Sequence, residues 1–148
     1  MAGHKQPVSV LVLIHTTELD VLLLERAAHP GFWQSVTGSC EGDEAFAAAA
    51  VREVSEETGI ACREPDLVDW RVSNRFEIFS QWRDRYAAGV THNVEHVFSL
   101  CVDRDVAVTL APAEHRAFRW LPWSNAATAC FSWTNRDAIL MLGAGLRR

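Results

Sequence analysis

The sequence predicts an α/β fold in which a mixed sheet is packed against helices. The first observation is a set of apolar, β-branched runs, such as residues 8–15, whose pattern is typical of buried strands. The second is a long alanine-rich stretch with helical periodicity that ends before Gly59. The third is that strand-like and helix-like segments alternate irregularly, with no internal repeat and no linker-like tract. This alternation favours a mixed sheet covered by helices.

The first half of the chain is expected to hold three strands and a long helix. The expected strands cover residues 8–15, 21–26 and 32–38, separated by a polar turn at 16–20 and a loop at 27–31. The helix is expected to begin after Asp43, whose carboxylate suits an N-cap. It is expected to end at Thr58, because Gly59 suits the C′ position.

The second half is expected to add four strand-like segments and two helices. The strand-like segments cover residues 67–73, 75–80, 93–102 and 115–122, with loops at 84–93 and 111–114. A short helix is expected at 123–130 and a final helix at 134–146. The final helix has apolar residues on one side, namely Ala138, Ile139, Leu142 and Leu146. We expect the 148 residues to form one domain, 1–148.

Composition and charge exclude several classes of protein. The longest apolar runs are about ten residues, too short to cross a bilayer, and the polar start is unlike a signal peptide. A formal net charge of -5 argues against a broad nucleic-acid-binding face. The four cysteines lack zinc-ligand spacing, which is typical of reduced thiols. We therefore expect a cytoplasmic protein that binds neither membrane nor nucleic acid, and the sequence is compatible with a monomer.

The alanine-rich helix has two neighbouring faces with different chemistry. At about 100° per residue, the stripe expected to face the core comprises Ala47, Val51, Val54 and Thr58. The adjacent face carries Phe46, Ala49, Ala50, Glu53 and Glu57, with Glu56 beside it. Small alanines allow close packing against a sheet, so the carboxylates are expected at the edge of a packed element rather than in bulk solvent.

The crowding of carboxylates near the end of this helix is locally unfavourable. Glu53 and Glu57 are like charges at i,i+4, and acids in the last turns oppose the helix dipole. One interpretation is a solvated acidic face that Arg52 partly offsets. The other is a cluster of hard oxygen ligands for Mg²⁺ or Mn²⁺, which in turn bind phosphate oxygens.

The spacing of the surrounding residues decides between these interpretations. The constrained positions are Gly38, Glu44, Arg52, Glu53, Val54, Glu56, Glu57, Gly59 and Ile60. This series, over residues 38–60, resembles the Nudix box at every fixed position. The resemblance implies a Nudix hydrolase, with an α/β/α sandwich fold, that hydrolyses a diphosphate linkage with the help of Mg²⁺ or, as a substitute, Mn²⁺.

The resemblance also implies a role for each polar residue of the box. Gly38 begins the loop that leads into the helix, and Arg52 pairs with a nearby acid or loop carbonyl and so holds the glutamates in place. Glu53, Glu56 and Glu57 hold divalent metal ions, with Glu53 and Glu57 binding the same cluster. One glutamate of the helix or of a loop activates the attacking water.

Stretches outside the box resemble one subfamily, the bacterial dihydroneopterin triphosphate pyrophosphohydrolases. These stretches are KQPVSVLV, LLLER, FWQSVTGS, RFEIFSQWRDRYAAGVTHNVEHVFSL and SWTNRDAI. They imply metal-dependent hydrolysis of 7,8-dihydroneopterin triphosphate to the monophosphate and pyrophosphate in folate biosynthesis. A broader pyrophosphohydrolase for (d)NTPs, including oxidised ones, is the alternative. A Nudix-fold sensor that binds without cleaving is disfavoured, because every box glutamate is present.

The subfamily resemblance also implies substrate contacts. Lys5 and Arg26 contact phosphate, Thr37 lines the pocket and Ser132 closes it. The wall for the pterin comprises Phe76, Glu77, Ile78 and Phe79. An aromatic face stacks on a flat ring, and a carboxylate accepts from ring N–H groups. Each of these residues also has a structural interpretation, as an exposed cation, a strand residue or a helix cap.

Two further features of the sequence bear on the site. Glu114, on a late loop outside the box, is implied as another metal-binding or water-activating carboxylate that also meets the substrate. Its alternative is an ordinary surface acid. Trp33 and Trp82 suit either pocket or core, and the core is the expectation.

Overall fold

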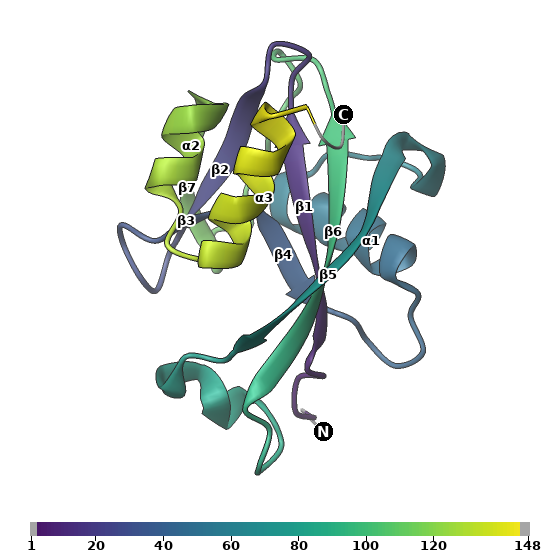
Figure 1. Cartoon of the computed structure of the whole chain (residues 1–148), viewed down its shortest axis with the longest axis vertical. Helices are drawn as coiled ribbons and strands as arrows, with labels where there is room; N and C mark the ends of the chain where they lie inside the picture. Colours follow the sequence, from purple (N-terminus) through teal and green to yellow (C-terminus); the bar gives the residue numbers. More distant parts are fainter. Residues whose placement is uncertain (1–2, 146–148) are drawn as a thin grey trace.

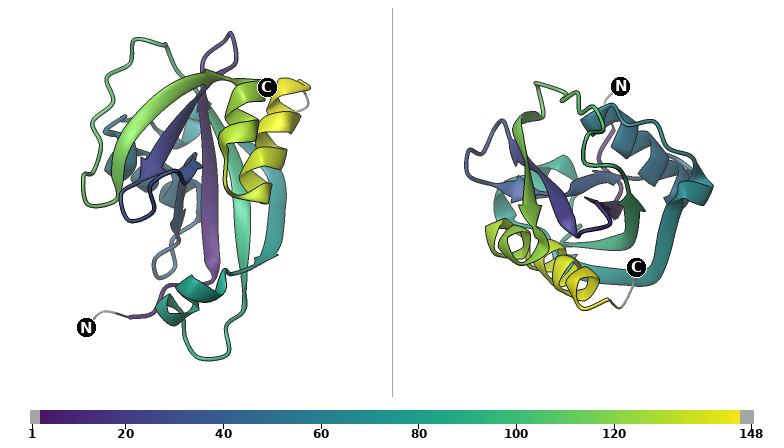
Figure 2. Two further views of the ribbon diagram at one scale, coloured as in Figure 1. Left: turned by 90° about the vertical axis from the view of Figure 1, so that its left-hand side faces the viewer. Right: turned by 90° about the horizontal axis from the view of Figure 1, so that it is seen from above.

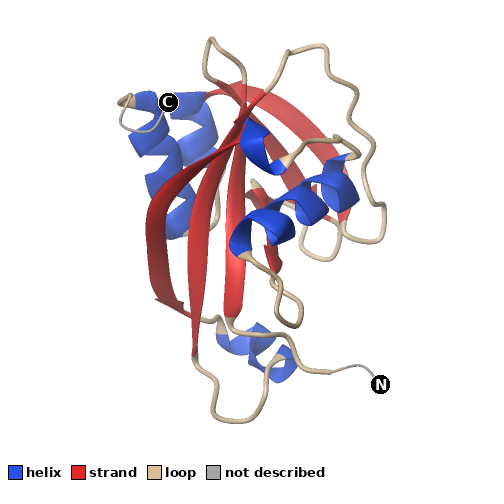
Figure 3. Cartoon of the chain, turned by 90° about the vertical axis from the view of Figure 1, so that its right-hand side faces the viewer, coloured by secondary structure: helices blue, strands red, loops and turns tan. Residues whose placement is uncertain are grey.

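The computed structural model describes residues 3–145 of the chain. A seven-stranded mixed sheet lies between helix α1 on one face and helices α2 and α3 on the other (Figure 1, Figure 3). The strands are β1 (Val8–His15), β2 (Asp20–Arg26), β3 (Trp33–Gln34), β4 (Val36–Ser39), β5 (Leu67–Glu77), β6 (His92–Cys101) and β7 (His115–Pro122). The helices are α1 (Phe46–Thr58), α2 (Trp123–Ala129) and α3 (Trp133–Gly143), with 3₁₀ segments η1 (Glu64–Asp66) and η2 (Ser80–Arg85). The predicted α/β/α sandwich is confirmed.

Strand β1 lies near the centre of the sheet and changes partner along one edge. It pairs in parallel with β6 along its whole length. Its other edge pairs with β4 over residues 9–12 and meets β2 only at His15. Strand β2 pairs antiparallel with both β3 and β7, and β5 pairs antiparallel with β6. The sheet therefore divides into two arms, β2 with β3 and β7, and β1 with β6 and β5, with β4 between them (Figure 1).

Two hydrophobic layers hold the helices to the sheet. Val10 and Val12 pack in the layer that includes residues of α1, whereas Leu11 and Leu13 pack in the layer that includes α2 and α3. This division follows because successive residues of a strand point to opposite faces. Burying each such aliphatic side chain stabilises the fold by about 1.5–3 kcal/mol. Helices α2 and α3 lie side by side on their face (Figure 2).

The predicted single strand at 32–38 is two short strands. Ser35 separates β3, which pairs with β2, from β4, which pairs with β1. Its backbone N–H donates to Asn135 Oδ1 at 2.8 Å, and Asn135 Nδ2 donates to the Ser35 hydroxyl at 3.0 Å. The Ser35 N–H therefore bonds to a side chain of α3 instead of a neighbouring strand. At this residue the chain changes its pairing partner from β2 to β1.

Helix α1 begins later than predicted. Its N-cap is Ala45, which makes no side-chain cap hydrogen bond, so the prediction of Asp43 as the cap is wrong. Glu44 closes the preceding turn instead, because its N–H donates to the Glu41 carbonyl and its carboxylate accepts from the Glu41 N–H. The predicted C-terminal end is confirmed, since Gly59 follows the helix in the left-handed conformation, with φ of 72°.

Helix α1 also turns a different face to the sheet. The predicted core positions Ala47 and Val51 are only half-buried, whereas Ala49 and Ala50 are fully buried. The small alanines allow a closer approach to the sheet than the predicted stripe would. As a result, the neighbouring acidic face of the helix is carried into the interior.

The second half of the chain differs from the prediction in one strand and agrees with it in α3. The segments expected at 67–73 and 75–80 form one strand, β5, whose pairing with β6 shifts between Asp69 and Ser73, near Arg71 with φ of 55°. In α3, Ala138, Ile139 and Leu142 are buried as expected, and Leu146 lies outside the described residues. No helix within residues 3–145 combines the length and the apolar character needed to span a bilayer.

Candidate active site

A cavity of about 1050 Å³ is lined by residues from both arms of the sheet. Further walls come from α1, η2 and the N-terminal end of α3. Every residue that the sequence singled out for catalysis, metal binding or substrate binding lines this cavity. They are Lys5, Arg26, Thr37, Arg52, Glu53, Glu56, Glu57, Phe76, Glu77, Ile78, Phe79, Glu114 and Ser132. Their grouping is a finding of the structure, whereas their individual roles stay predictions.

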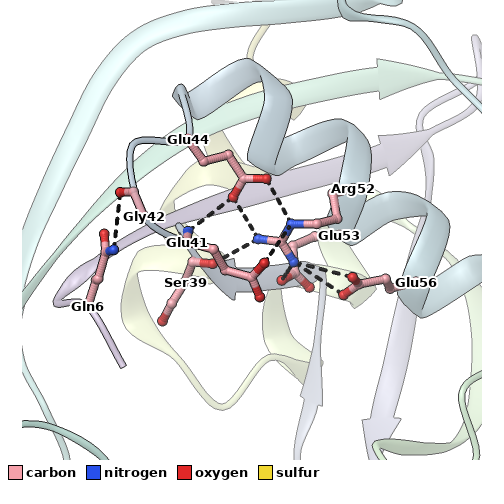
Figure 4. A network of polar contacts seen from close by, with 8 residues as sticks. All are labelled: Gln6, Ser39, Glu41, Gly42, Glu44, Arg52, Glu53 and Glu56. Carbon is pink, nitrogen blue, oxygen red and sulfur yellow. Dashed lines mark hydrogen bonds and ion pairs between the residues drawn. The ribbon is translucent and has the colours of Figure 1, made fainter. Parts of the chain in front are cut away.

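Arg52 is the centre of a polar network along α1 (Figure 4). Its Nε and Nη2 both donate to the Glu44 carboxylate at 2.8 Å, a two-point contact. Nη2 also donates to the Ser39 carbonyl at 3.0 Å, and Nη1 to Glu53 Oε1 at 2.8 Å. These contacts, with the hydrogen bonds to Glu44 as the largest cause, raise the pKa of Arg52. The expected acidic partner of Arg52 is therefore present, and the backbone carbonyl that it contacts is at the end of β4 rather than in a loop.

Glu53 lies directly against the backbone of β4 at Gly38. A Cβ atom at position 38 would overlap the Glu53 carboxylate, so only glycine leaves room for this side chain. Gly38 lies within β4 and does not begin the loop, which corrects the role that the resemblance implied. Burial raises the pKa of Glu53, although hydrogen bonds with Glu57 and Arg52 oppose the shift.

Glu57 is a buried carboxylate with an unpartnered oxygen. It is 2% exposed, and its Oε1 has no hydrogen-bond partner among the residues that the structure describes. That oxygen lies 3.9 Å from His115 Nδ1, which also lacks a partner. Burial first, and then Glu53 and Glu114, raise the pKa of Glu57 well above its usual value. An unpaired buried carboxylate oxygen is costly, and a bound cation would offset that cost.

Glu56 and Glu114 are exposed carboxylates at the edge of the same cavity. Glu56 Oε2 lies 3.3 Å from Arg52 Nη1 (Figure 4). The loop of Glu114 is attached to the end of β2, because the Ala27 N–H donates to the Glu114 carbonyl at 2.9 Å. Within residues 3–145, no three acidic, imidazole or thiol side chains already surround a common point. A metal ion held by these carboxylates would therefore require them to rotate, and the exposed ones have room to turn.

Three basic residues face these carboxylates across the cavity. The Lys5 N–H donates to the Arg85 carbonyl at 2.8 Å, which attaches the N-terminal segment to η2. Burial, followed by Arg85 and Arg26, lowers the pKa of Lys5, and burial followed by Arg85 lowers that of Arg26. The Arg26 guanidinium lies 4.7 Å from the Trp82 ring centroid, and its Nε is buried without a partner in the described part of the chain, residues 3–145. This group of cations suits the several charges of a triphosphate.

The predicted wall of Phe76, Glu77, Ile78 and Phe79 is an aromatic corner of the cavity. Ile78 is buried and Phe76 half-buried, whereas Phe79 is exposed and packs on Trp82 with ring centroids 5.2 Å apart. The Glu77 side chain is 67% exposed at the mouth, where it is paired with Arg83. We call this corner, with its floor described below, the ring pocket.

The two tryptophans have different surroundings. Trp33 packs on the core layer of α2 and α3, as expected. Trp82 lines the cavity, so the prediction that it belongs to the core is wrong. Its ring meets Phe131 at 5.9 Å in an edge-to-face arrangement, and Phe131 stacks on Phe32 at 4.8 Å. These contacts extend the aromatic wall across the cavity.

The floor of the ring pocket is polar. The Thr37 hydroxyl donates to the Val10 carbonyl at 3.0 Å. Ser132 is the N-cap residue of α3 and makes no cap hydrogen bond, and its hydroxyl lies 2.9 Å from that of Thr134. Both residues line the cavity.

The cavity residues that were not predicted from the sequence include Arg85, Asn93, Glu95, His115 and Phe131. A signal for two of them is visible in the sequence. Asn93 and Glu95 are polar residues on one face of a strand whose second half, residues 97–101, is mostly apolar. A buried polar residue in such a strand needs a partner or a ligand. The other three depend on tertiary packing, for which the local sequence carries no signal.

Comparisons with known proteins agree with this geometry. A model of the Nudix domain matches residues 5–141, so the chain belongs to the Nudix family of hydrolases. The chain is similar to the dihydroneopterin triphosphate diphosphatase of Escherichia coli strain K12, with 44% identity over 139 residues, 92% of this chain and 91% of the relative. It is 38% identical over 151 residues to the Haemophilus influenzae dihydroneopterin triphosphate diphosphatase, covering 100% of this chain and 94% of the relative.

A solved structure agrees as well. The E. coli dihydroneopterin triphosphate pyrophosphohydrolase superposes with a TM-score of 0.86 at 44% identity, covering 93% of this chain and 94% of that one. The predictions of a Nudix hydrolase and of its fold are thereby confirmed. Nudix hydrolases generally use divalent metal ions, and this chain belongs to that class of enzyme.

Proposed function

We propose that this Nudix hydrolase cleaves 7,8-dihydroneopterin triphosphate to dihydroneopterin monophosphate and pyrophosphate. The observation that carries the proposal is a single cavity that joins the acidic face of α1 to the aromatic ring pocket. The acidic face suits a metal-bound triphosphate, and the ring pocket suits a flat heterocycle. The similarity to two diphosphatases that act on this compound supports the choice of ring.

We propose Mg²⁺ as the cofactor, with Mn²⁺ as a substitute. Glu53, Glu57 and Glu114 are the proposed ligands, with Glu56 beside them. The donor set fits, because all are hard carboxylate oxygens and one buried oxygen of Glu57 has no other partner. When bound, the metal ion neutralises phosphate charge and makes its bound water easier to deprotonate.

The chain's own residues have distinct tasks in this proposal. Lys5 and Arg26 bind phosphate oxygens and draw the triphosphate towards the carboxylates. Arg52 holds Glu53 in place through the contacts described above. A glutamate of the site accepts a proton as water attacks phosphorus and the bridging P–O bond breaks, so that pyrophosphate leaves from the monophosphate.

Substrate preference is the test of this function. The carboxylates can serve any triphosphate, so selectivity must come from the ring pocket. We expect kcat/KM for dihydroneopterin triphosphate to exceed that for dGTP by at least about tenfold, one strong contact's worth of binding. The measurement is pyrophosphate release with Mg²⁺ across a panel of the pterin triphosphate, dGTP, dATP and oxidised dNTPs. Equal efficiency on dGTP or dATP would leave only the broader (d)NTP pyrophosphohydrolase.

Glu114 offers a second test. If it binds metal or positions water, Glu114→Ala should lower kcat far more than it raises KM, because the lost contact acts on the reacting phosphate and not on the ring. Steady-state kinetics of the purified variant measure the two effects separately. Asp105→Ala, which removes an exposed acid from another loop, is the matched control and should change neither. A normal kcat for Glu114→Ala would assign this residue to the surface.

We further propose that the reaction belongs to folate biosynthesis and takes place in the cytoplasm. The pterin ring of the proposed product is the reason for the pathway. The four cysteines are all free thiols, which suits a reducing compartment. The proposed partner is thus a small-molecule triphosphate and neither nucleic acid nor membrane.

A further inference from the structure

Glu95 is a buried carboxylate in the ring pocket. Among the described residues it forms no ion pair, and it is not one of the residues proposed for hydrolysis. It lies on β6, is 5% exposed and lines the cavity. Its Oε1 accepts from the Thr134 hydroxyl at 2.9 Å. The Thr37 hydroxyl also approaches it, but this single proton is shared with the Val10 carbonyl. Burial raises the pKa of Glu95 to about 7, and no cation among the described residues counteracts that shift.

Asn93 presents a second acceptor beside Glu95. The two residues are two positions apart on β6, so their side chains point to the same face of the sheet. Asn93 is 3% exposed, and its Nδ2 donates to the Ser9 hydroxyl at 2.7 Å. Its Oδ1 is buried without a partner among the residues that the structure describes. The pocket floor therefore holds an unpartnered amide oxygen beside a carboxylate that receives hydroxyl hydrogen bonds but has no N–H donor or cation among the described residues.

Thr37 places these acceptors next to the hydrolytic carboxylates. Its backbone hydrogen-bonds to Glu57, and its side chain approaches Glu95. One residue of β4 thus lies between the two groups. A ligand whose ring meets Glu95 can therefore extend its phosphates towards α1 through the same cavity.

The chemistry of these acceptors selects for a ligand with adjacent donors. A buried carboxylate without a cation is best satisfied by two parallel N–H groups. The 2-amino-4-oxo edge of a pterin supplies them, because its ring N–H and exocyclic amino group lie side by side. Guanine has the same edge, whereas adenine lacks the ring N–H and thymine lacks the amino group. Low local polarity in an aromatic pocket strengthens such a contact.

Building on the proposed function, we propose that Glu95, with Asn93 beside it, binds the N–H edge of the substrate ring and determines which rings are accepted. This assigns to Glu95 the recognition that sequence resemblance suggested for Glu77. Glu77 is exposed at the mouth and already paired with Arg83. A contact in water contributes less to discrimination than one in a closed pocket.

Direct binding of an unphosphorylated ring isolates this contact from hydrolysis. The experiment titrates neopterin into the full-length protein without metal and follows the pterin fluorescence. Glu95→Gln should raise Kd at least about tenfold, the range expected for losing a hydrogen bond to a charged group. Asp69→Asn is the matched control, because it makes the same change on β5, outside the cavity, and it should leave Kd unchanged.

A second variant keeps the test independent of any one substitution. Asn93→Ala removes the free amide oxygen and should also weaken neopterin binding. Wild-type Kd values for both Glu95→Gln and Asn93→Ala would overturn the proposal. The proposal would also be overturned if only Glu77→Gln weakened neopterin binding. That result would assign the ring contact to Glu77, at the mouth of the pocket.

Nucleotide selectivity separates this inference from the proposed function. In Glu95→Gln, the ratio of kcat/KM for dGTP to that for dATP should fall, since only guanine presents the paired donors. If the wild-type enzyme shows no pterin preference but this ratio falls, the proposed function fails and the role of Glu95 stands. If the wild-type enzyme prefers the pterin and the ratio is unchanged, the role of Glu95 fails and the function stands.

Discussion

Glu57→Gln is expected to lower kcat by orders of magnitude and to leave the fold intact. Glu57 is buried in the cavity and is a proposed metal ligand, because its Oε1 has no hydrogen-bond partner within residues 3–145. An amide keeps the shape of the side chain but removes the charge that a divalent ion requires. The substitution also relieves the like-charge contact with Glu53, so the folded state loses nothing electrostatically. Turnover at saturating Mg²⁺ and the melting temperature measure the two effects.

The control for this prediction is Glu64→Gln. Glu64 is an exposed acid of η1, and it does not line the cavity. It should retain wild-type turnover in the same assay. Unchanged turnover in Glu57→Gln at saturating Mg²⁺ would remove Glu57 from the catalytic residues.

Glu95→Gln is expected to stabilise the folded protein above neutral pH. Burial raises the folded-state pKa of this carboxyl to about 7, from an ordinary value of 4.5. The folded state therefore favours the protonated form, and the stability from that proton is fully present below pH 4.5. It is lost as the pH rises towards 7, above which the fold holds a buried charge. This difference corresponds to about 3 kcal/mol at most.

The amide of Glu95→Gln does not titrate, so the difference between variant and wild type should depend on pH. Urea unfolding of the metal-free proteins should show a free energy of unfolding about 1–3 kcal/mol higher for the variant at pH 8. At pH 5 the gain should largely disappear. Asp69→Asn, whose wild-type carboxyl has a lowered pKa, should show no such rise between pH 5 and pH 8. A pH-independent difference would mean that the carboxyl is ionised throughout.

If Glu95→Gln both stabilises the folded protein and weakens ring binding, then Glu95 lowers the stability of the fold and contributes to ligand binding. A residue that serves only the fold should not stabilise the protein when it is removed. A residue retained for ligand binding often does, because its unpaired polar atoms are satisfied only in the complex. The two measurements on one variant thus distinguish a structural acid from a recognition residue.

Local sequence patterns were sufficient for most of the fold. Apolar runs located β1, β2 and β6, and Gly59 marked the end of α1, because these features depend on neighbouring residues. The break at Ser35 could not be predicted, since its N–H bonds to Asn135, which is 100 positions away. The rotation of α1 was also missed. It depends on how closely small residues of the helix fit the sheet, which periodicity does not describe.

The same distinction applies to the site. The residues of the Nudix box that were predicted for hydrolysis do line one cavity, because the spacing of the box constrains them within one short segment of the chain. Arg85 and Phe131 reach the cavity through a 3₁₀ segment and an interhelical loop, whose positions are set by tertiary packing. Glu95 lies in a strand that was predicted correctly, but only the structure shows that it is buried without a cation, beside an unpartnered oxygen of Asn93.

The position of Thr37 on β4 has a consequence for how such an enzyme diversifies. In the proposed function, the carboxylates of α1 serve the phosphates and the side chains of β6 serve the ring, and Thr37 of β4 contacts both groups. Substitutions on β6 or at the start of α3 can therefore alter which organic group is accepted without moving the glutamates of α1. Selection could exchange one metabolite for another in few steps, while the carboxylates of α1 are inherited intact.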